Sequence, residues 1–390
     1  MIKDFVKPPL RIFLGFIREQ LTSYRLKRTA GSSALAEKLF TDSIISFVKS
    51  MQVDYSGFAF RYSANCSAPT LYSSVYACMI YSMLNRLDSY SVQEKNAWAD
   101  YFDSFQRQDD GLFHDSVVFG REVIEGDWWG GEHLALHIIY AYHALGRRPK
   151  HPFYFLKCYY SKQLMIEWLD QLPWTSVEIG NKDADNTIMN VGALLQYQRD
   201  FWGDADASTA LEVLKEYLLK RINPETGLWG AFDPSDKFQL SRMVQFAYHL
   251  MSLFFYDGFF EFQSDRIVNL VLRTQNRLGG FGVQLNSSAC EDIDSIDILL
   301  RLRPFVSKAS AARIDRSIER SYSWVLANQV EDGGMVFRLF EGLTYGHRQM
   351  MSKCNQGAMF PTWFRTLSIA YMLRDKNSLF TINRVPGLMF

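Results

Sequence analysis

Glycine-containing turns recur along the chain at a nearly regular interval. Each has polar residues before the glycine and an apolar or aromatic residue close behind it, and they centre on Gly57, Gly111, Gly227, Gly280 and Gly333. These glycines are 54, 116, 53 and 53 residues apart, and the double-length interval has room for a degenerate turn near Leu172-Pro173-Trp174. A period of this size is typical of architectures that repeat one supersecondary unit. The 390 residues are therefore expected to form one repetitive domain.

Two kinds of helix are expected between successive turns. The helix before a turn is amphipathic, as in residues 207–221 and 310–330, which is typical of an outer layer. The helix after a turn is apolar over most of its circumference, which is typical of a buried helix. We expect the buried helices to begin at Pro69, Gly131, Asp185, Leu240, Asp294 and Pro361. The pattern predicts an all-α fold, an (α/α)6 barrel (α-toroid) of six helical hairpins over residues 31–390.

Composition excludes some classes of function. Lysine plus arginine equals aspartate plus glutamate at 42 each, so the chain lacks the basic excess of a nucleic-acid binder. The five cysteines are scattered without a metal-binding spacing, which indicates a reduced, cytoplasmic protein. No run of about 18 apolar residues is present, so no transmembrane helix is expected. The 15% aromatic content suits an apolar, ring-lined cavity as well as thick helix packing.

Residues 1–30 form a basic amphipathic segment ahead of the predicted barrel. Apolar residues alternate with lysines and arginines over residues 1–28, a pattern that fits a helix lying on an anionic membrane surface. The same pattern fits a leading helix whose apolar face packs on the barrel. Peripheral membrane contact through this segment therefore stays an open alternative.

Two of the predicted inner helices begin with more acid than a helix start needs. Residues 290–297 contain four carboxylates, and ionising all of them in a buried site is costly because like charges raise one another's pKa. N-capping by Asp contributes about 1 kcal/mol and explains one acid per helix, but not two to four. A crowded carboxyl group that stays protonated can act as a Brønsted acid. The candidate catalytic residues are Asp292, Asp294, Asp183 and Asp185.

The segment Gln275-Asn276-Arg277-Leu278-Gly279-Gly280-Phe281 resembles the glutamine–glycine–aromatic repeat of the terpene cyclase and protein prenyltransferase superfamily. Gln108–Phe113 and Gln329–Met335 are weaker copies of it. In the squalene–hopene-type class II cyclases, such a turn precedes an Asp-x-Asp-Asp-Thr-Ala helix start whose middle aspartate protonates the substrate. The resemblance implies that Asp294 is the proton donor and that Asp292 is its carboxylate partner.

The chain departs from both branches of this superfamily at specific positions. Ser295 replaces the last aspartate of the cyclase motif and Ile296 replaces its threonine. The zinc-binding Asp-x-Cys pair of the protein prenyltransferases is absent. No metal site and no cofactor are therefore predicted, although dependence on a divalent metal stays open.

Two further segments carry candidate substrate-binding residues. Paired tryptophans before an acid and a histidine resemble the sugar-stacking platforms of (α/α)6 polysaccharide lyases, epimerases and glycosidases, although tryptophans also commonly fill cores. A loop with a tyrosine, a histidine and an arginine can abstract a proton or bind an anion, or can simply face solvent. These candidates are Trp128, Trp129, Glu132, His133, Tyr345, His347 and Arg348. His133 and His137 share a helix face, but a packed pair is favoured over a metal site because no third ligand has a suitable spacing.

Three functions are compatible with these features. The first is a class II terpene cyclase-like enzyme, in which Asp294 protonates an isoprenoid inside an aromatic cavity. The second is a glycan-active enzyme, a lyase, epimerase or hydrolase, that uses Asp183 and Asp185 with the tryptophans and His347. The third is a toroid that binds a lipid or glycan without catalysis. The expected partner is thus a hydrophobic isoprenoid or a glycan, and not a nucleic acid.

Overall fold

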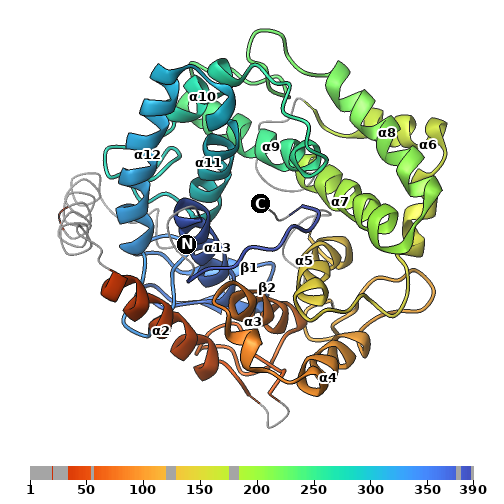
Figure 1. Ribbon diagram of the computed structural model, residues 1–390, viewed down its shortest axis with the longest axis vertical. Coiled ribbons are helices and arrows are strands. Elements are labelled where there is room, and N and C mark those ends of the chain that lie inside the picture. Colours follow the sequence, from red (N-terminus) through yellow and green to blue (C-terminus); the bar gives the residue numbers. More distant parts are fainter. Residues whose placement is uncertain are drawn as a thin grey trace, which may run out of the picture.

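Helices alternate along the chain between an inner and an outer ring (Figure 1). The computed structural model describes residues 20, 34–53, 57–119, 129–174, 184–374 and 379–387. Apart from residue 20, the basic segment 1–30 lies outside the described residues, and so do both alternatives for it, membrane contact and packing on the barrel. None of the described helices is long and apolar enough to cross a bilayer.

The two rings together form a closed toroid. The inner helices are α3 (Leu71–Met83), α5 (Gly131–Ala144), α7 (Ala184–Trp202), α9 (Lys237–Tyr256), α11 (Ala289–Leu302) and α13 (Met359–Leu373). The outer helices are α2 (Ala34–Ser50), α4 (Val92–Asp103), α6 (Lys162–Gln171), α8 (Ala205–Lys220), α10 (Ser264–Arg273) and α12 (Lys308–Leu326). Each inner helix packs on the next, and α13 packs on α3 to close the ring. The predicted (α/α)6 barrel is confirmed.

Short elements connect the helices. They are the 3-10 helices η1 (Arg86–Ser89), η2 (Tyr154–Tyr159) and η3 (Arg303–Phe305), and the antiparallel strands β1 (Leu343–Tyr345) and β2 (His347–Ser352). The sequence predicted a loop at residues 345–348, and this prediction is wrong because the chain forms a hairpin that turns at Gly346. Gly346 has a φ of 73°, a left-handed conformation that glycine adopts at little cost.

The pattern of buried residues differs between the inner and the outer helices. Every residue of α3 is buried, as expected for a helix that is apolar all round. In α12, by contrast, burial is confined to one stripe that includes Ile314, Trp324 and Val325. The difference follows from position, because an inner helix contacts neighbours on all sides and an outer helix faces solvent on one.

In each of three repeating turns, a glutamine side chain stabilises the turn. Gln275 Nε2 donates to the carbonyl of Gly279 at 2.9 Å and to that of Ser317, in the next outer helix, also at 2.9 Å. Gln329 makes the equivalent bond to Gly333 at 3.0 Å. In the second repeat this residue is Gln106, which donates to Gly111 at 2.8 Å. The sequence pattern placed this glutamine at Gln108, and the residue that makes the bond lies two positions earlier.

The turn glycines allow close approach between neighbouring repeats. Gly279 has a φ of 102°, and a Cβ there would overlap the carbonyl of Arg320 in α12. Gly333 has a φ of 87°, and a Cβ there would overlap the carbonyl of Ser43 in α2. The last turn of the chain thus packs directly on the first outer helix. In the fourth predicted turn it is Gly279, and not Gly280, that takes the left-handed conformation.

Asp292 joins a turn, an outer helix and an inner helix inside the protein core. Its carboxylate accepts hydrogen bonds from the backbone N–H of Phe281, Ser287 Oγ, Trp324 Nε1 and Arg365 Nη1, at 2.7–2.8 Å. Asp292 is 1% exposed and Arg365 is fully buried. Arg365 also donates to the carbonyls of Val336 and Phe337. This network fixes the start of α11 relative to α12 and α13.

We expect Asp292→Ala to destabilise the protein by about 3–5 kcal/mol, because it leaves the buried Arg365 without its anionic partner. Urea unfolding followed by circular dichroism measures this change. Asp315→Ala is the control, since Asp315 pairs with Arg303 at the surface, where an ion pair contributes at most about 1 kcal/mol. Equal losses in the two variants would contradict the role given to Asp292.

Candidate active site

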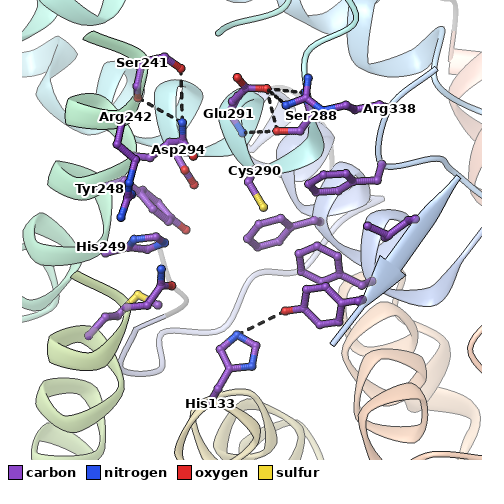
Figure 2. Close-up of a pocket in the computed structure, with 18 of the residues that line it drawn as sticks. His133, Ser241, Arg242, Tyr248, His249, Ser288, Cys290, Glu291, Asp294 and Arg338 are labelled. Carbon is purple, nitrogen blue, oxygen red and sulfur yellow. Dashed lines mark hydrogen bonds and ion pairs between the residues drawn. The ribbon is translucent and has the colours of Figure 1, made fainter. Parts of the chain in front are cut away.

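A cavity of about 460 Å³ lies inside the inner ring. Residues from α5, α7, α9, α11 and α13 line it, together with residues of β1 and of the segments that lead into α11 and β1. Figure 2 shows Arg242, Tyr248 and His249 on one side, Cys290, Glu291 and Asp294 from α11, and His133 across the space. Most of these residues belong to the first half of their helices, so the cavity occupies one end of the toroid.

Aromatic rings form a large part of the cavity wall. They belong to Phe238, Tyr248, Phe337, Tyr345, Phe360 and Phe364. Tyr345 stacks on Phe360 with ring centroids 4.3 Å apart, and Phe360 in turn lies 4.9 Å from Phe364. Aromatic rings offer a large apolar surface and carry partial negative charge on their faces.

Asp294 is a buried carboxyl group without a hydrogen-bond partner. The residue is 1% exposed and lines the cavity, and neither of its carboxyl oxygens has a partner among the described residues. Burial raises the pKa of Asp294 well above its usual value, and the negative charge of Asp185 raises it further. Asp294 therefore holds its proton more tightly than an ordinary aspartate, and it faces a cavity that aromatic and polar side chains both line.

The helix geometry explains why Asp292 and Asp294 behave differently. Successive helix residues are rotated by about 100°, so positions two apart point about 200° apart. Asp292 consequently faces the turn and α12, whereas Asp294 faces the cavity. The four donors to Asp292 do not include Asp294, and Asp292 does not line the cavity. The expected pairing of these two carboxyl groups is therefore corrected to a structural role for Asp292.

Asp185 is held as a carboxylate by two residues of α9. Arg242 Nη1 and Nη2 donate to its two oxygens at 2.9 and 2.6 Å, and His249 Nδ1 lies 2.7 Å from Oδ2. Burial alone raises the pKa of Asp185, but Arg242 and His249 outweigh it and hold the pKa below its usual range. Asp185 thus keeps its negative charge behind the cavity wall, with Arg242 and His249 between it and the cavity.

This ion pair acts on Asp294 in two opposite ways. After burial, the charge of Asp185 is the largest contribution that raises the pKa of Asp294, and the charge of Arg242 lowers it. The carboxylate that tunes Asp294 is therefore contributed by α7, and not by the residue two positions before it in α11.

His133 and His137 are neutral bases in the wall. Tyr72 Oη lies 2.9 Å from His133 Nδ1, and Tyr345 Oη lies 3.4 Å from Nε2. Burial and the neighbouring histidines lower the pKa of His133 well below its usual value, and burial lowers that of His137 to about 4. Among the described residues no group of three or more potential ligands could hold a metal ion.

Several residues predicted for substrate binding lie away from this cavity. Trp129 is 4% exposed and stacks on Tyr72 beneath the hairpin turn, with ring centroids 5.2 Å apart. Glu132 lines a separate cavity of about 390 Å³, where burial raises its pKa to about 7. His347 is buried and Arg348 exposed, and neither lines the main cavity. Of the predicted binding residues that the structure describes, only His133 and Tyr345 line it.

Two of the predicted residues are not described by the structure, and two residues of the site were not predicted. Asp183 and Trp128 lie outside the described residues. Arg242 and His249 were not identified from the sequence. Their signal was the placement of polar residues three and four apart (Arg242, Gln245 and His249) on one face of an otherwise apolar inner helix.

The helix starts near the site also differ from the predicted ones. α11 begins at Ala289, five residues before the predicted Asp294, because Ser288 and Glu291 form a reciprocal capping box. Ser288 Oγ accepts from the N–H of Glu291 at 3.1 Å, and the Glu291 carboxylate also binds Arg338 at 2.7 Å. The acid at this helix start is therefore Glu291, and Asp294 lies inside the helix.

A family profile described as the prenyltransferase alpha-alpha toroid domain matches residues 26–127 and 182–350. No curated protein matches the chain in sequence. Among solved structures, the type II terpene cyclase MstE from Scytonema is similar, with 12% identity, a TM-score of 0.46, and coverage of 88% of this chain and 99% of that chain. A glycosyl hydrolase of family 88 from Bacteroides vulgatus is similar at 12% identity and a TM-score of 0.48, over 86% of this chain and 99% of that chain.

The ent-copalyl diphosphate synthase from Streptomyces platensis is a third similar structure. It has 14% identity and a TM-score of 0.42, and the match covers 77% of this chain and 50% of that chain. These likenesses concern the fold alone.

The state of Asp294 predicts how stability depends on pH. In the unfolded chain this carboxyl group titrates near pH 4, whereas its folded pKa is raised. As the pH rises from about 4 towards the folded pKa, the unfolded chain loses this proton first, so the stability contributed by Asp294 falls. We expect the free energy of unfolding of the wild type, relative to Asp294→Asn, to decrease over this range. Urea unfolding at a series of pH values measures it, and a difference independent of pH would contradict the assignment.

Proposed function

The chain belongs to the prenyltransferase alpha-alpha toroid domain family, and we propose that it is a class II terpene cyclase-like enzyme that protonates an isoprenoid. The observation that carries the proposal is Asp294, a carboxyl group with a raised pKa and no hydrogen-bond partner, facing an aromatic cavity. A protonated acid that is not engaged elsewhere can give its proton to a weak base such as an alkene.

The proposed reaction begins with proton transfer from Asp294. The π electrons of a terminal alkene form a new C–H bond with the carboxyl proton, which leaves Asp294 as a carboxylate and the substrate as a tertiary carbocation. Internal alkenes then attack the cation and form rings. A final C–H bond breaks, its electrons form the product alkene, and the released proton balances the one donated at the start.

The cavity walls support such a reaction in two ways. The ring faces of Tyr248, Phe360 and Phe364 can attract a carbocation, as aromatic faces attract other cations. A hydrocarbon substrate that lies along these rings would also displace water, which would otherwise capture the cation. At about 460 Å³ the cavity lies within the range of roughly 300–1,000 Å³ that is usual for small-molecule sites.

The glycan-active alternative receives less support from the described residues. It needs exposed tryptophan rings and a carboxylate available to a sugar, but Trp129 is buried and Asp185 is bound to Arg242 and His249. His347 lies outside the cavity lining. A site built from these residues would require them to leave their present partners.

We expect Asp294→Asn to lower the rate of product formation by about 10²–10⁴-fold, because amides do not replace a general acid. The assay incubates the enzyme with farnesyl diphosphate, geranylgeranyl diphosphate and squalene, and analyses products by gas chromatography with mass spectrometry. Since this variant is expected to be at least as stable as the wild type near neutral pH, loss of activity would not reflect unfolding. Equal turnover by the two proteins, or activity only on oligosaccharides, would contradict the proposal.

The ion pair behind the wall provides a second test, based on opposite shifts. Asp185→Asn removes a negative charge near Asp294 and is expected to lower the pH at which activity is lost on the alkaline side. Arg242→Gln removes a positive charge and is expected to raise it. The measurement is kcat/KM as a function of pH for the two variants. Shifts in the same direction would indicate a purely structural role for the pair.

A further inference from the structure

We propose that the C-terminal segment, residues 379–387, closes the far end of the toroid and sets the length of substrate that the cavity accepts. Figure 1 shows this segment, in dark blue, crossing the central opening of the ring. The inference rests on the proposed function for the identity of the substrate, an isoprenoid chain. The closure itself follows from the contacts of the segment.

Hydrogen bonds fix the segment to the last turns of two inner helices on opposite sides of the opening. The N–H of Thr381 donates to the carbonyl of Met83 at 2.8 Å, and Asn383 Nδ2 donates to Ser82 Oγ at 3.1 Å. Both acceptors lie at the end of α3. Arg384 donates to the carbonyl of Tyr256, the last residue of α9, and its guanidinium carbon lies 5.0 Å from the Tyr256 ring centroid.

From these anchors the chain enters the ring. Val385 is fully buried, and Gly387 lies so close to α5 and α7 that a Cβ there would overlap Leu136 and make a tight contact with Ala193. Both of these residues lie in the middle of their helices. Leu136 also lines the cavity, so a single side chain has the cavity on one side and Gly387 on the other.

This arrangement gives the cavity a defined depth. Its lining on α9 extends from Phe238 to His249, whereas the segment binds Tyr256 two turns further along the same helix. A chain that grows longer than the cavity must therefore meet Leu136 with the backbone of residue 387 behind it. Because backbone held by hydrogen bonds at both α3 and α9 cannot rotate aside as a side chain can, the limit on length is a firm one.

The test measures binding of saturated isoprenoid alcohols by isothermal titration calorimetry, graded in length from fully hydrogenated geraniol to fully hydrogenated geranylgeraniol. These ligands have no alkene to protonate, so binding does not depend on catalysis. Asn383→Ala combined with Arg384→Ala loosens the segment, and deletion of the chain after residue 378 removes it. Arg303→Ala is the control for the arginine substitution, because Arg303 lies outside the segment and pairs with Asp315 at the surface.

In the wild type and the control we expect affinity to rise with ligand length and then to fall at a sharp limit. In both tail variants the limit is expected to move to a longer alcohol. Because each methylene removed from water improves binding by roughly fourfold, admitting two further carbons tightens binding by about sixteenfold. The double substitution keeps the test decisive if the truncated chain does not fold.

The outcomes distinguish this inference from the proposed function. An unchanged length limit in a folded tail variant overturns the inference, whether or not the enzyme cyclises isoprenoids. A shifted length limit supports the inference even if the enzyme converts none of farnesyl diphosphate, geranylgeranyl diphosphate and squalene. In that case the proposed catalysis is contradicted and the closure by the segment is not. Absence of any length-dependent binding in the wild type would overturn the inference.

Discussion

The ion pair between Asp292 and Arg365 is the interaction on which the position of the site depends. Burying two charges is costly, and the structure offsets this cost by giving the carboxylate three further donors and the guanidinium three backbone carbonyls. The pair connects the start of α11 to α12 and α13. Once α11 is fixed in this way, Asp294 is directed into the cavity by helix geometry alone. Asp294 and Asp292 thus lie on opposite faces of the same helical turn.

Three aspartates on the inner helices show how environment divides one residue type into separate roles. Asp292 accepts from four donors, Asp185 is paired with Arg242 and His249, and Asp294 has no partner among the described residues. Hydrogen bonds and opposite charge oppose burial at both Asp185 and Asp292: they lower the pKa of Asp185, whereas burial still raises that of Asp292. Asp294 has no hydrogen bond of this kind, so burial and the charge of Asp185 raise its pKa well above the usual value. Of these three aspartates, Asp294 is the one that lines the cavity with a raised pKa.

The ring of helices was predictable from the sequence because its signals are local: the glycine turns, the stripe on residues 310–330 and the apolar circumference of the inner helices. Asp294 was predictable as a candidate because its neighbours are acidic, but the role of Asp292 was not, since its partner Arg365 is 73 residues away. Arg242 and Asp185 are similarly separated by 57 residues. The hairpin at residues 343–352 was missed because a short strand pair over an aromatic cluster carries no periodicity that a sequence displays.

The contact between α13 and α3, together with that between Gly333 and α2, has a consequence for folding. In an open solenoid each repeat stabilises only its neighbours, so the ends can unravel independently. In this protein the first and last hairpins are neighbours, and neither can bury its inner face until almost the whole chain has been synthesised. Because such distant contacts form slowly and are needed on both sides, partial chains remain exposed during synthesis. Closure therefore couples the hairpins into one cooperative unit that forms late.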